Sequence, residues 1–279
     1  MKALVPPHIA FAFVVTLCAS SWLTAAARAQ DASPWQRDGH SALRLLAGSR
    51  SGTVLLGGIA LQLQPGWHTY WRSPGDSGVP PRFDFSKSDN IEAVTVLWPA
   101  PTEFDDGAGG HSLGYHDQLV LPLRIVTKNA DKPVTLRADV SYAVCEKICI
   151  PVDAKAELPF TSVVSTEDSA LFAALDTVPK PANIGDPNPL TIRDVKREGQ
   201  SVMVDVAAPE ARDVSLFVEG PTPDWALPIP TPDAHSPSGV KRFSFALDGL
   251  PPGAKPDGAA LKFTLVGADK AYEFNVNLP

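Results

Sequence analysis

The sequence predicts an all-β protein made of two β-sandwich domains, which a short helix and a proline-rich linker join. Three observations predict this class. The chain of 279 residues contains 28 prolines and 20 glycines, and they recur between short apolar segments, as in proteins with many short strands. Ile59, Leu61 and Leu63 alternate with Ala60 and Gln62, which is the period of a half-buried strand. A proline-rich stretch at 180–189 separates two strand-rich regions.

The N-terminus has the features of a cleaved export signal at residues 1–29. Lys2 precedes an apolar segment at 9–17, and Ala27-Arg28-Ala29 is a small-x-small cleavage site. Cleavage removes Lys2 and Arg28 and no acid, so 22 basic residues remain against 31 acidic ones and the net charge moves from −7 to −9. An acidic chain without a basic run argues against nucleic acid or anionic lipid as a partner. We therefore expect a soluble periplasmic protein with no direct membrane insertion.

The first domain is expected over residues 30–180 and contains a series of strands. Pro122 removes a backbone donor, so its strand is expected at a sheet edge or at a bulge. The last two strands are separated by only three residues, which predicts a tight hairpin. The expected strands cover residues 53–64, 67–72, 91–98, 119–127, 134–145 and 149–160.

One helix is expected after these strands. Ser165 and Asp168 form a start that is similar to a capping box, and good helix formers follow. Pro179 and Pro181 cannot continue a helix, so it should end near Thr177. A linker at 181–189 then leads to a second, smaller sandwich at 190–279. Its six expected strands cover residues 190–196, 201–207, 214–219, 242–247, 261–266 and 272–278.

Cys145 and Cys149 are the only cysteines of the chain after removal of the export signal, and a tight turn at 146–148 would let them face each other. In an oxidising compartment such a pair normally forms a disulfide. A five-residue loop gains only about 2 kcal/mol from chain entropy, against about 4.7 kcal/mol for a loop of about 100 residues. A disulfide here would therefore stabilise the fold only weakly. Redox chemistry and a structural disulfide are both open alternatives for this pair.

Metal binding is a third alternative for the pair. Two thiolates could hold copper or zinc with His111 and His116 as nitrogen ligands, although the spacing matches no known zinc finger. Hydrolytic chemistry is not indicated, because the chain has no GxSxG, HExxH, GxGxxG or Walker sequence.

Four motifs follow the order found in a known family. They are GWHTYWR at 66–72, LWP at 97–99, LVLPL at 119–123 and VSYAVCEKICIP at 140–151. Residues 40–160 resemble the periplasmic N-terminal domain of the DsbD family of disulfide reductases, and are most similar to the ScsB (suppressor of copper sensitivity) branch. The most specific parts are YWRSPGDSGVPPRF and VCEKICIP. The second sandwich also resembles the ScsB arrangement in its strand spacing.

The resemblance implies an immunoglobulin-like fold and a cysteine pair that shuttles between dithiol and disulfide. It assigns Cys149 to the mixed disulfide with a partner and Cys145 to its resolution. It also implies a shielding stretch at 103–114, where Phe104 is the candidate shield, and places Trp67 and Tyr70 as candidate contacts of the site. An ordinary core position is the alternative for each of these three aromatic residues.

The resemblance further implies thioredoxin-fold proteins or domains as partners, without cofactor or metal. The chain has neither the eight-helix membrane domain nor the thioredoxin-like domain of those reductases, so a separate membrane reductase is the expected electron source. Such proteins are associated with cytochrome c biogenesis and copper tolerance. The alternatives are a protein-interaction module with a structural disulfide and a copper-handling protein. The second domain is expected to be either a recognition surface or a spacer.

Overall fold

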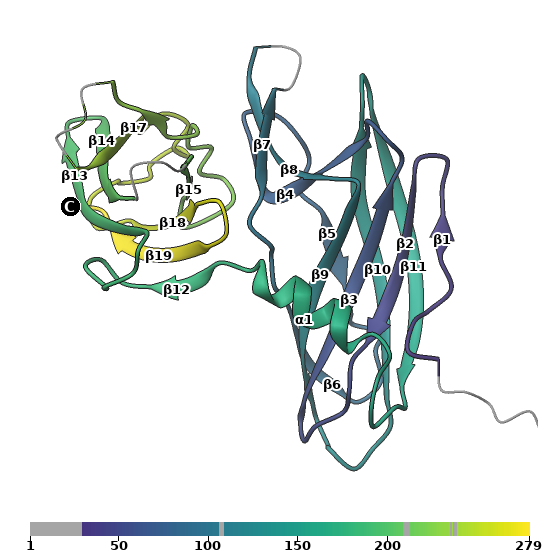
Figure 1. The fold of residues 1–279 in the computed structure, drawn as a ribbon. Helices are drawn as coiled ribbons and strands as arrows, with labels where there is room; N and C mark the ends of the chain where they lie inside the picture. The colour runs from purple at the N-terminus through teal and green to yellow at the C-terminus, as the bar shows by residue number, and fades with distance from the viewer. Residues whose placement is uncertain (1–29, 106–108, 209–212, 235, 237–238) are drawn as a thin grey trace, which may run out of the picture.

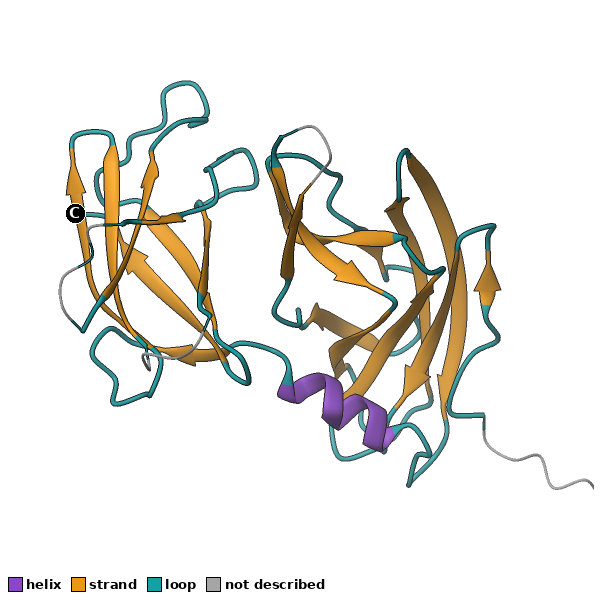
Figure 2. Cartoon of the chain, turned by 45° about the horizontal axis from the view of Figure 1, so that its top comes forward, coloured by secondary structure: helices purple, strands orange, loops and turns teal. Residues whose placement is uncertain are grey.

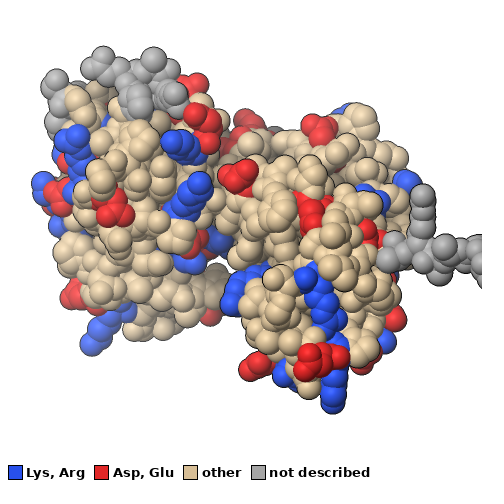
Figure 3. Space-filling view, turned by 60° about the horizontal axis from the view of Figure 1, so that its bottom comes forward, with Lys and Arg blue, Asp and Glu red and all other residues tan. Residues whose placement is uncertain are grey.

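The computed structural model describes residues 30–105, 109–208, 213–234, 236 and 239–279, so the expected export signal lies outside the described residues. The protein consists of two β-sandwich bodies, which α1 (Asp168–Asp176) connects along the chain (Figure 1). In the part of the chain that the structure describes, no helix has the length and apolar character needed to cross a membrane. On the face shown in Figure 3, acidic and basic side chains are interspersed over both lobes.

The first sandwich packs two antiparallel sheets against each other (Figure 2). One sheet has the order β1-β2-β3-β9-β6, and the other has the order β11-β10-β4-β8-β7, with β5 paired to β10. The strands are β1 (Gln36–Arg37), β2 (Ser41–Ala47), β3 (Val54–Leu63), β4 (His68–Gly75), β5 (Arg82–Asp84), β6 (Ile91–Val96), β7 (Thr102–Asp105), β8 (His111–His116), β9 (Gln118–Thr127), β10 (Val134–Cys145) and β11 (Cys149–Phe160).

The alternation of β10 and β11 explains their place in this sandwich. From Val152 to Phe160 every second residue of β11 is buried and the residues between are exposed. This period of two places one face on the core and the other in solvent. The all-β, immunoglobulin-like fold class is confirmed.

The expectation for Pro122 was wrong, because β9 lies inside its sheet between β3 and β6, and Pro122 pairs with Gly58 without a bulge. The carbonyl of Pro122 accepts a hydrogen bond from Leu97 (N···O 2.8 Å), one residue beyond the end of β6. The N–H and C=O of one strand residue point to the same side. The backbone N–H that Pro122 lacks would therefore face Leu97, where β6 has already ended. The ladder between β6 and β9 thus loses no hydrogen bond.

The helix ends as expected at Thr177, but the expected capping box at its start was wrong. The N-cap residue is Glu167, whose side chain makes no capping hydrogen bond. Ser165 lies two residues earlier, and its hydroxyl donates a hydrogen bond to the carbonyl of Ala47 (2.6 Å). The carboxylate of Asp168 accepts hydrogen bonds from Ser49, one of them from the backbone N–H at 2.7 Å. Both side chains thus attach the helix to the first sandwich, and the fully buried Leu171 supplies the apolar contact.

The second sandwich has two sheets of four strands, in the orders β12-β19-β18-β15 and β13-β14-β17-β16. The first three residues of the expected proline-rich connection form β12, which pairs with β19 in parallel. The strands are β12 (Lys180–Ala182), β13 (Thr191–Glu198), β14 (Ser201–Ala207), β15 (Ser215–Glu219), β16 (Thr231–Pro232), β17 (Lys241–Ala246), β18 (Ala260–Val266) and β19 (Ala271–Asn277).

Candidate functional site

The two cysteines close the end of the longest hairpin of the described chain. β10 and β11 have 12 residues each, and their pairing runs from Val134↔Phe160 to Cys145↔Cys149, where a disulfide joins the last pair. The sulfur-bearing residues differ in access to solvent. Cys145 is 2% exposed, whereas Cys149 is exposed and the preceding Ile148 is 69% exposed. The two cysteines therefore differ in exposure, and Cys149 is the more exposed of the pair.

Tyr70 contacts both sulfur atoms from the neighbouring strand β4. Its hydroxyl lies 3.1 Å from Cys145 Sγ and 3.3 Å from Cys149 Sγ, and the residue is only 4% exposed. The pairing of β4 with β10 places Thr69 opposite Val144 and His68 opposite Cys145. A hydroxyl in this position can donate a hydrogen bond to either sulfur. Such a bond becomes charge-assisted when the sulfur is a thiolate.

Gly78 fits closely over the ring of Tyr70. A Cβ atom at this position would lie 2.5 Å from two ring carbons, and the backbone φ of +123° is one that L side chains rarely adopt. Glycine is the residue that meets both demands. The segment 76–78 is attached to β8 by the Ser77 Oγ to Ser112 Oγ contact (2.9 Å) and by two hydrogen bonds between Asp76 and His111. The backbone N–H of Asp76 donates to the carbonyl of His111 (2.9 Å), and the backbone N–H of His111 donates to the carboxylate of Asp76 (3.0 Å). These residues hold the Tyr70 ring against the disulfide.

Phe104 on β7 packs against the cluster of Tyr70, Ala143 and Cys145. Two histidines flank its ring: His68 lies 4.4 Å away and His116 lies 4.9 Å away, between ring centroids. Burial, and secondarily the charge of His116, lower the pKa of His68 below its usual value. The neutral form of His68 is thereby favoured in this apolar setting.

A cavity of about 380 Å³ lies in front of the disulfide. Residues of β4, of the segment 77–79, of β8 and of the cysteine hairpin line it. Asp105, Glu146 and Lys147 are the charged residues among them. The cavity is large enough for a few side chains, and both cysteines lie along it.

Comparison with known proteins relates the first sandwich to a family. Residues 45–161 match the family model described as "Thiol:disulfide interchange protein DsbD, N-terminal". The first sandwich resembles the DsbD N-terminal domain. The match begins in β2, ends one residue after β11, and includes both cysteines, Tyr70, Gly78 and Phe104. The part of the chain that is similar to DsbD is thus the first sandwich, which is called the DsbD-like domain below.

A solved structure extends the likeness of the fold beyond the DsbD-like domain. The N-terminal periplasmic domain of ScsB from Proteus mirabilis superposes with a TM-score of 0.71 at 21% sequence identity, and the alignment covers 89% of this chain and 98% of that chain. A marsupial T cell receptor covers 88% of this chain and 99% of its own at 11% identity, but its TM-score of 0.22 supports no argument. Among curated proteins, none matches this chain in sequence.

The structure brings some of the predicted site residues together and separates others. Tyr70 and Phe104 lie at the disulfide of the DsbD-like domain. Trp67 is instead in the main core, where it stacks on His40 with ring centroids 3.8 Å apart, and it does not line the cavity. Its role as a partner contact stays a prediction.

The two histidines considered as metal ligands lie in different places. His111 pairs with Glu103 (3.1 Å), whereas His116 packs on Phe104 and His68. Among the described residues, no group of three or more His, Cys, Asp and Glu side chains is arranged to hold a metal ion.

Sequence reasoning missed three contributors to the site. His68, Gly78 and Ser112 all line the cavity of the DsbD-like domain. The signal for His68 was its position two residues before Tyr70, which places both side chains on one face of a strand. Gly78 stood inside the most specific motif, but its contact with Tyr70 depends on a tertiary approach that the motif does not indicate. The stretch 103–114 was expected to be a shielding loop. Most of its described residues belong to strands β7 and β8, and residues 106–108 lie outside the described part of the chain.

Proposed function

We propose that this protein passes electrons between thioredoxin-fold proteins in the periplasm by thiol–disulfide exchange at Cys145 and Cys149. The match to the DsbD N-terminal model supports the chemistry. The ScsB structure, which is described as an N-terminal periplasmic domain, supports the compartment. A separate membrane reductase is the proposed source of electrons, and an exported chain is part of the same proposal.

The observation that carries this proposal is the unequal exposure of a disulfide beside a cavity. Cys149 is exposed and Cys145 is buried. Exchange requires a thiolate to approach one sulfur in line with the S–S bond, so access decides which sulfur is attacked. Cys149 is therefore the proposed site of the mixed disulfide, and Cys145 is the leaving group.

The exchange balances as follows. A thiolate of the reduced partner attacks Cys149 Sγ, a new S–S bond forms, and the bond to Cys145 breaks with Cys145 leaving as a thiolate that takes up a proton. A second thiolate of the partner then attacks the partner's sulfur in the mixed disulfide, the bond to Cys149 breaks, and Cys149 leaves as a thiolate that also takes up a proton. Two electrons and two protons have moved to this protein, and the partner holds a disulfide. The reverse sequence delivers them to an oxidised acceptor.

Tyr70 is the proposed stabiliser of the thiolates formed in these steps. Its hydroxyl lies within hydrogen-bond distance of both sulfurs. A hydrogen bond to a charged sulfur is stronger than one to a neutral disulfide. The contact therefore favours the opened state more than the closed one, and it serves either leaving sulfur.

Trapping of mixed disulfides tests the proposal, with the two single-cysteine variants as matched controls. Cys145→Ser leaves the exposed Cys149 and is expected to capture a thioredoxin-fold protein from periplasmic extract, because the resolving thiol is absent. Cys149→Ser leaves the buried Cys145 and is expected to capture at least about tenfold less. Captured species are identified by mass spectrometry after non-reducing electrophoresis.

Three other results would contradict the proposal in different ways. Stronger capture by Cys149→Ser would reverse the roles of the cysteines. Capture of proteins without a thioredoxin fold would change the class of partner. A disulfide that stays oxidised in the folded protein with a thioredoxin-like reductant, and captures nothing, would leave a protein-interaction module with a structural disulfide.

A further inference from the structure

The second sandwich completes the apolar core of the first. Phe217 of β15 is 1% exposed and belongs to the core cluster of the first sandwich, and its ring lies 6.1 Å from that of the fully buried Trp71 of β4, between centroids. Ile229 and Val266 also pack against that cluster. The contact is made on β4, the strand that carries Tyr70.

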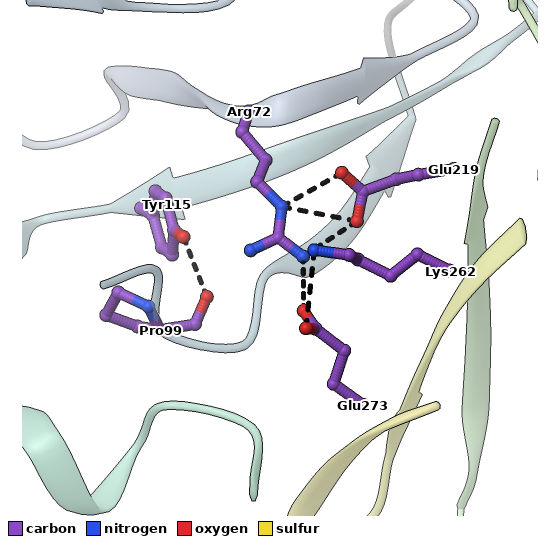
Figure 4. Close-up of polar contacts among 6 residues, drawn as sticks. All are labelled: Arg72, Pro99, Tyr115, Glu219, Lys262 and Glu273. Carbon is purple, nitrogen blue, oxygen red and sulfur yellow. Dashed lines mark hydrogen bonds and ion pairs between the residues drawn. The ribbon is translucent and has the colours of Figure 1, made fainter. Parts of the chain in front are cut away.

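Arg72 connects the same strand to the second sandwich by charge (Figure 4). Its guanidinium donates to Glu219 of β15 (Nη2···Oε2 2.7 Å and Nε···Oε1 2.9 Å) and to Glu273 of β19 (Nη2···Oε2 2.7 Å). Lys262 of β18 approaches Glu273 at 3.3 Å. Burial opposes the charge of Arg72, but the hydrogen bonds and charge of Glu219, and then those of Glu273, outweigh it and raise the pKa of the guanidinium.

The second sandwich also touches the end of β4, where the chain turns over Tyr70. A Cβ atom on Gly75 would lie 3.1 Å from Ile229 Cδ1, and Gly75 has a φ of +86°. The residues that follow are Asp76, Ser77 and Gly78, and the last of these packs on the Tyr70 ring. Trp71, Arg72 and Gly75 thus tie the second sandwich to both the strand and the turn that hold Tyr70.

We infer that the second sandwich is a positioning element for the disulfide, with Arg72 as the positioning residue that keeps the Tyr70 hydroxyl on both sulfurs. This inference rests on the proposed function, because it gives the second domain a part in that reaction. It distinguishes the second domain from a spacer, which would leave the disulfide unchanged when the connection is broken. It also requires that Arg72 act only through Tyr70.

The test is the rate of reduction of the disulfide by dithiothreitol in the full chain, together with the equilibrium potential against the same reagent. Dithiothreitol needs no docking surface, so both readouts report on the disulfide itself. Tyr70→Phe removes the hydroxyl and is expected to slow reduction about tenfold and to make the potential more reducing, because the thiolate loses a charge-assisted hydrogen bond. Arg72→Met is expected to slow it about threefold, since the hydroxyl is misplaced rather than lost.

The decisive comparison is the double variant. If Arg72 acts through Tyr70, Arg72→Met adds less than about a twofold effect in the Tyr70→Phe background. Arg242→Met is the matched control: Arg242 holds Asp205 in a bidentate pair within the second sandwich, and the side chains of Arg242 and Arg72 are 22% and 21% exposed. This control is expected to reduce as fast as the unmodified protein. Glu219→Gln replaces Arg72→Met if the latter does not fold.

Equal slowing by Arg72→Met with Tyr70 and with Phe at position 70 would overturn the inference, and so would unchanged rate and potential in a folded Arg72→Met variant. Slowing by Arg242→Met to the same extent would show a general loss of stability and would overturn it too. Failure of the proposed function is a separate result. There the dithiothreitol pattern is as expected, but no thioredoxin-fold protein is trapped.

Discussion

The two sandwiches differ in how complete they are. The core of the second sandwich is formed by its own residues, with partly buried neighbours from the second half of the chain. The core of the first sandwich includes Phe217 of the second, and the partly buried Ile229 and Val266 of the second pack against it. The first sandwich contains the disulfide, but apolar side chains of the second sandwich contribute to its core. The disulfide therefore lies in one domain, whereas part of the core that supports its neighbouring strand β4 comes from the other domain.

Truncation of Phe217 is expected to have the largest effect on this difference between the two cores, because it removes a side chain of the second sandwich from the core of the first. Phe217→Ala is expected to destabilise the protein by about 3–5 kcal/mol, because it leaves a cavity against Trp71. Amide hydrogen exchange should show lost protection in β4 and β8 of the first sandwich, although the altered residue lies in the second. Chemical denaturation gives the free energy of unfolding.

Phe245→Ala is the matched control for that prediction. Phe245 is 5% exposed and packs on Phe263 inside the second core. It should lose a similar free energy, with faster exchange confined to the second sandwich. Loss of protection in β4 by Phe245→Ala, or none there by Phe217→Ala, would mean that the two cores do not differ in this way.

Removal of Phe104 is expected to have an intermediate effect, on rate rather than on stability. Phe104 packs against Tyr70 and Cys145, and Phe104→Ala should open the approach to the disulfide. The rate constant for reduction by glutathione should rise roughly threefold, since exchange depends on access to the attacked sulfur. Phe85→Ala removes a partly buried ring that packs on the main core and is the control. An unchanged or slower rate in Phe104→Ala would exclude a shielding role.

The smallest expected effect is the pH dependence that His68 contributes to stability. Its pKa is lowered in the folded state by burial and by His116, so between the folded and unfolded pKa values the unfolded chain binds more protons. This contribution to stability is therefore complete above the usual value of 6.5 and is lost as the pH falls through the folded value. Urea midpoints at pH 7.5 and 5.5 should differ less in His68→Gln than in the unmodified protein. An equal or larger difference in the variant would contradict this.

Much of the fold could be predicted because its determinants are local. The spacing of Cys145 and Cys149, the alternation of the flanking strands and the end of the helix before Pro179 and Pro181 depend on neighbouring residues. Pro122 and Ser165 were misread for a related reason. Each has a strong local preference, and in the fold each finds a distant partner, Leu97 and Ala47, that changes its role.

The site was predicted in part. The structure brings together Cys145, Cys149, Tyr70 and Phe104, the residues that the motifs indicated. The connection of Arg72 to Glu219 and Glu273 spans 147 and 201 residues of sequence. Nothing in the local pattern of an arginine after two aromatic residues tells which of the many acidic residues it meets. Contacts of this range depend on how the two sandwiches pack, and a single sequence does not show that.

The long ladder between β10 and β11 has a consequence for the lifetime of any covalent complex. Eleven pairs precede the pair of positions 145 and 149, and this ladder is expected to keep the two positions opposite each other when the disulfide opens. After the bond opens, each thiol therefore meets the other at a high effective concentration, as in an intramolecular reaction between aligned groups. In the proposed exchange, a partner bound through Cys149 would therefore be released quickly, when the thiolate of Cys145 attacks the mixed disulfide. The hairpin would thus keep the lifetime of such a mixed disulfide short.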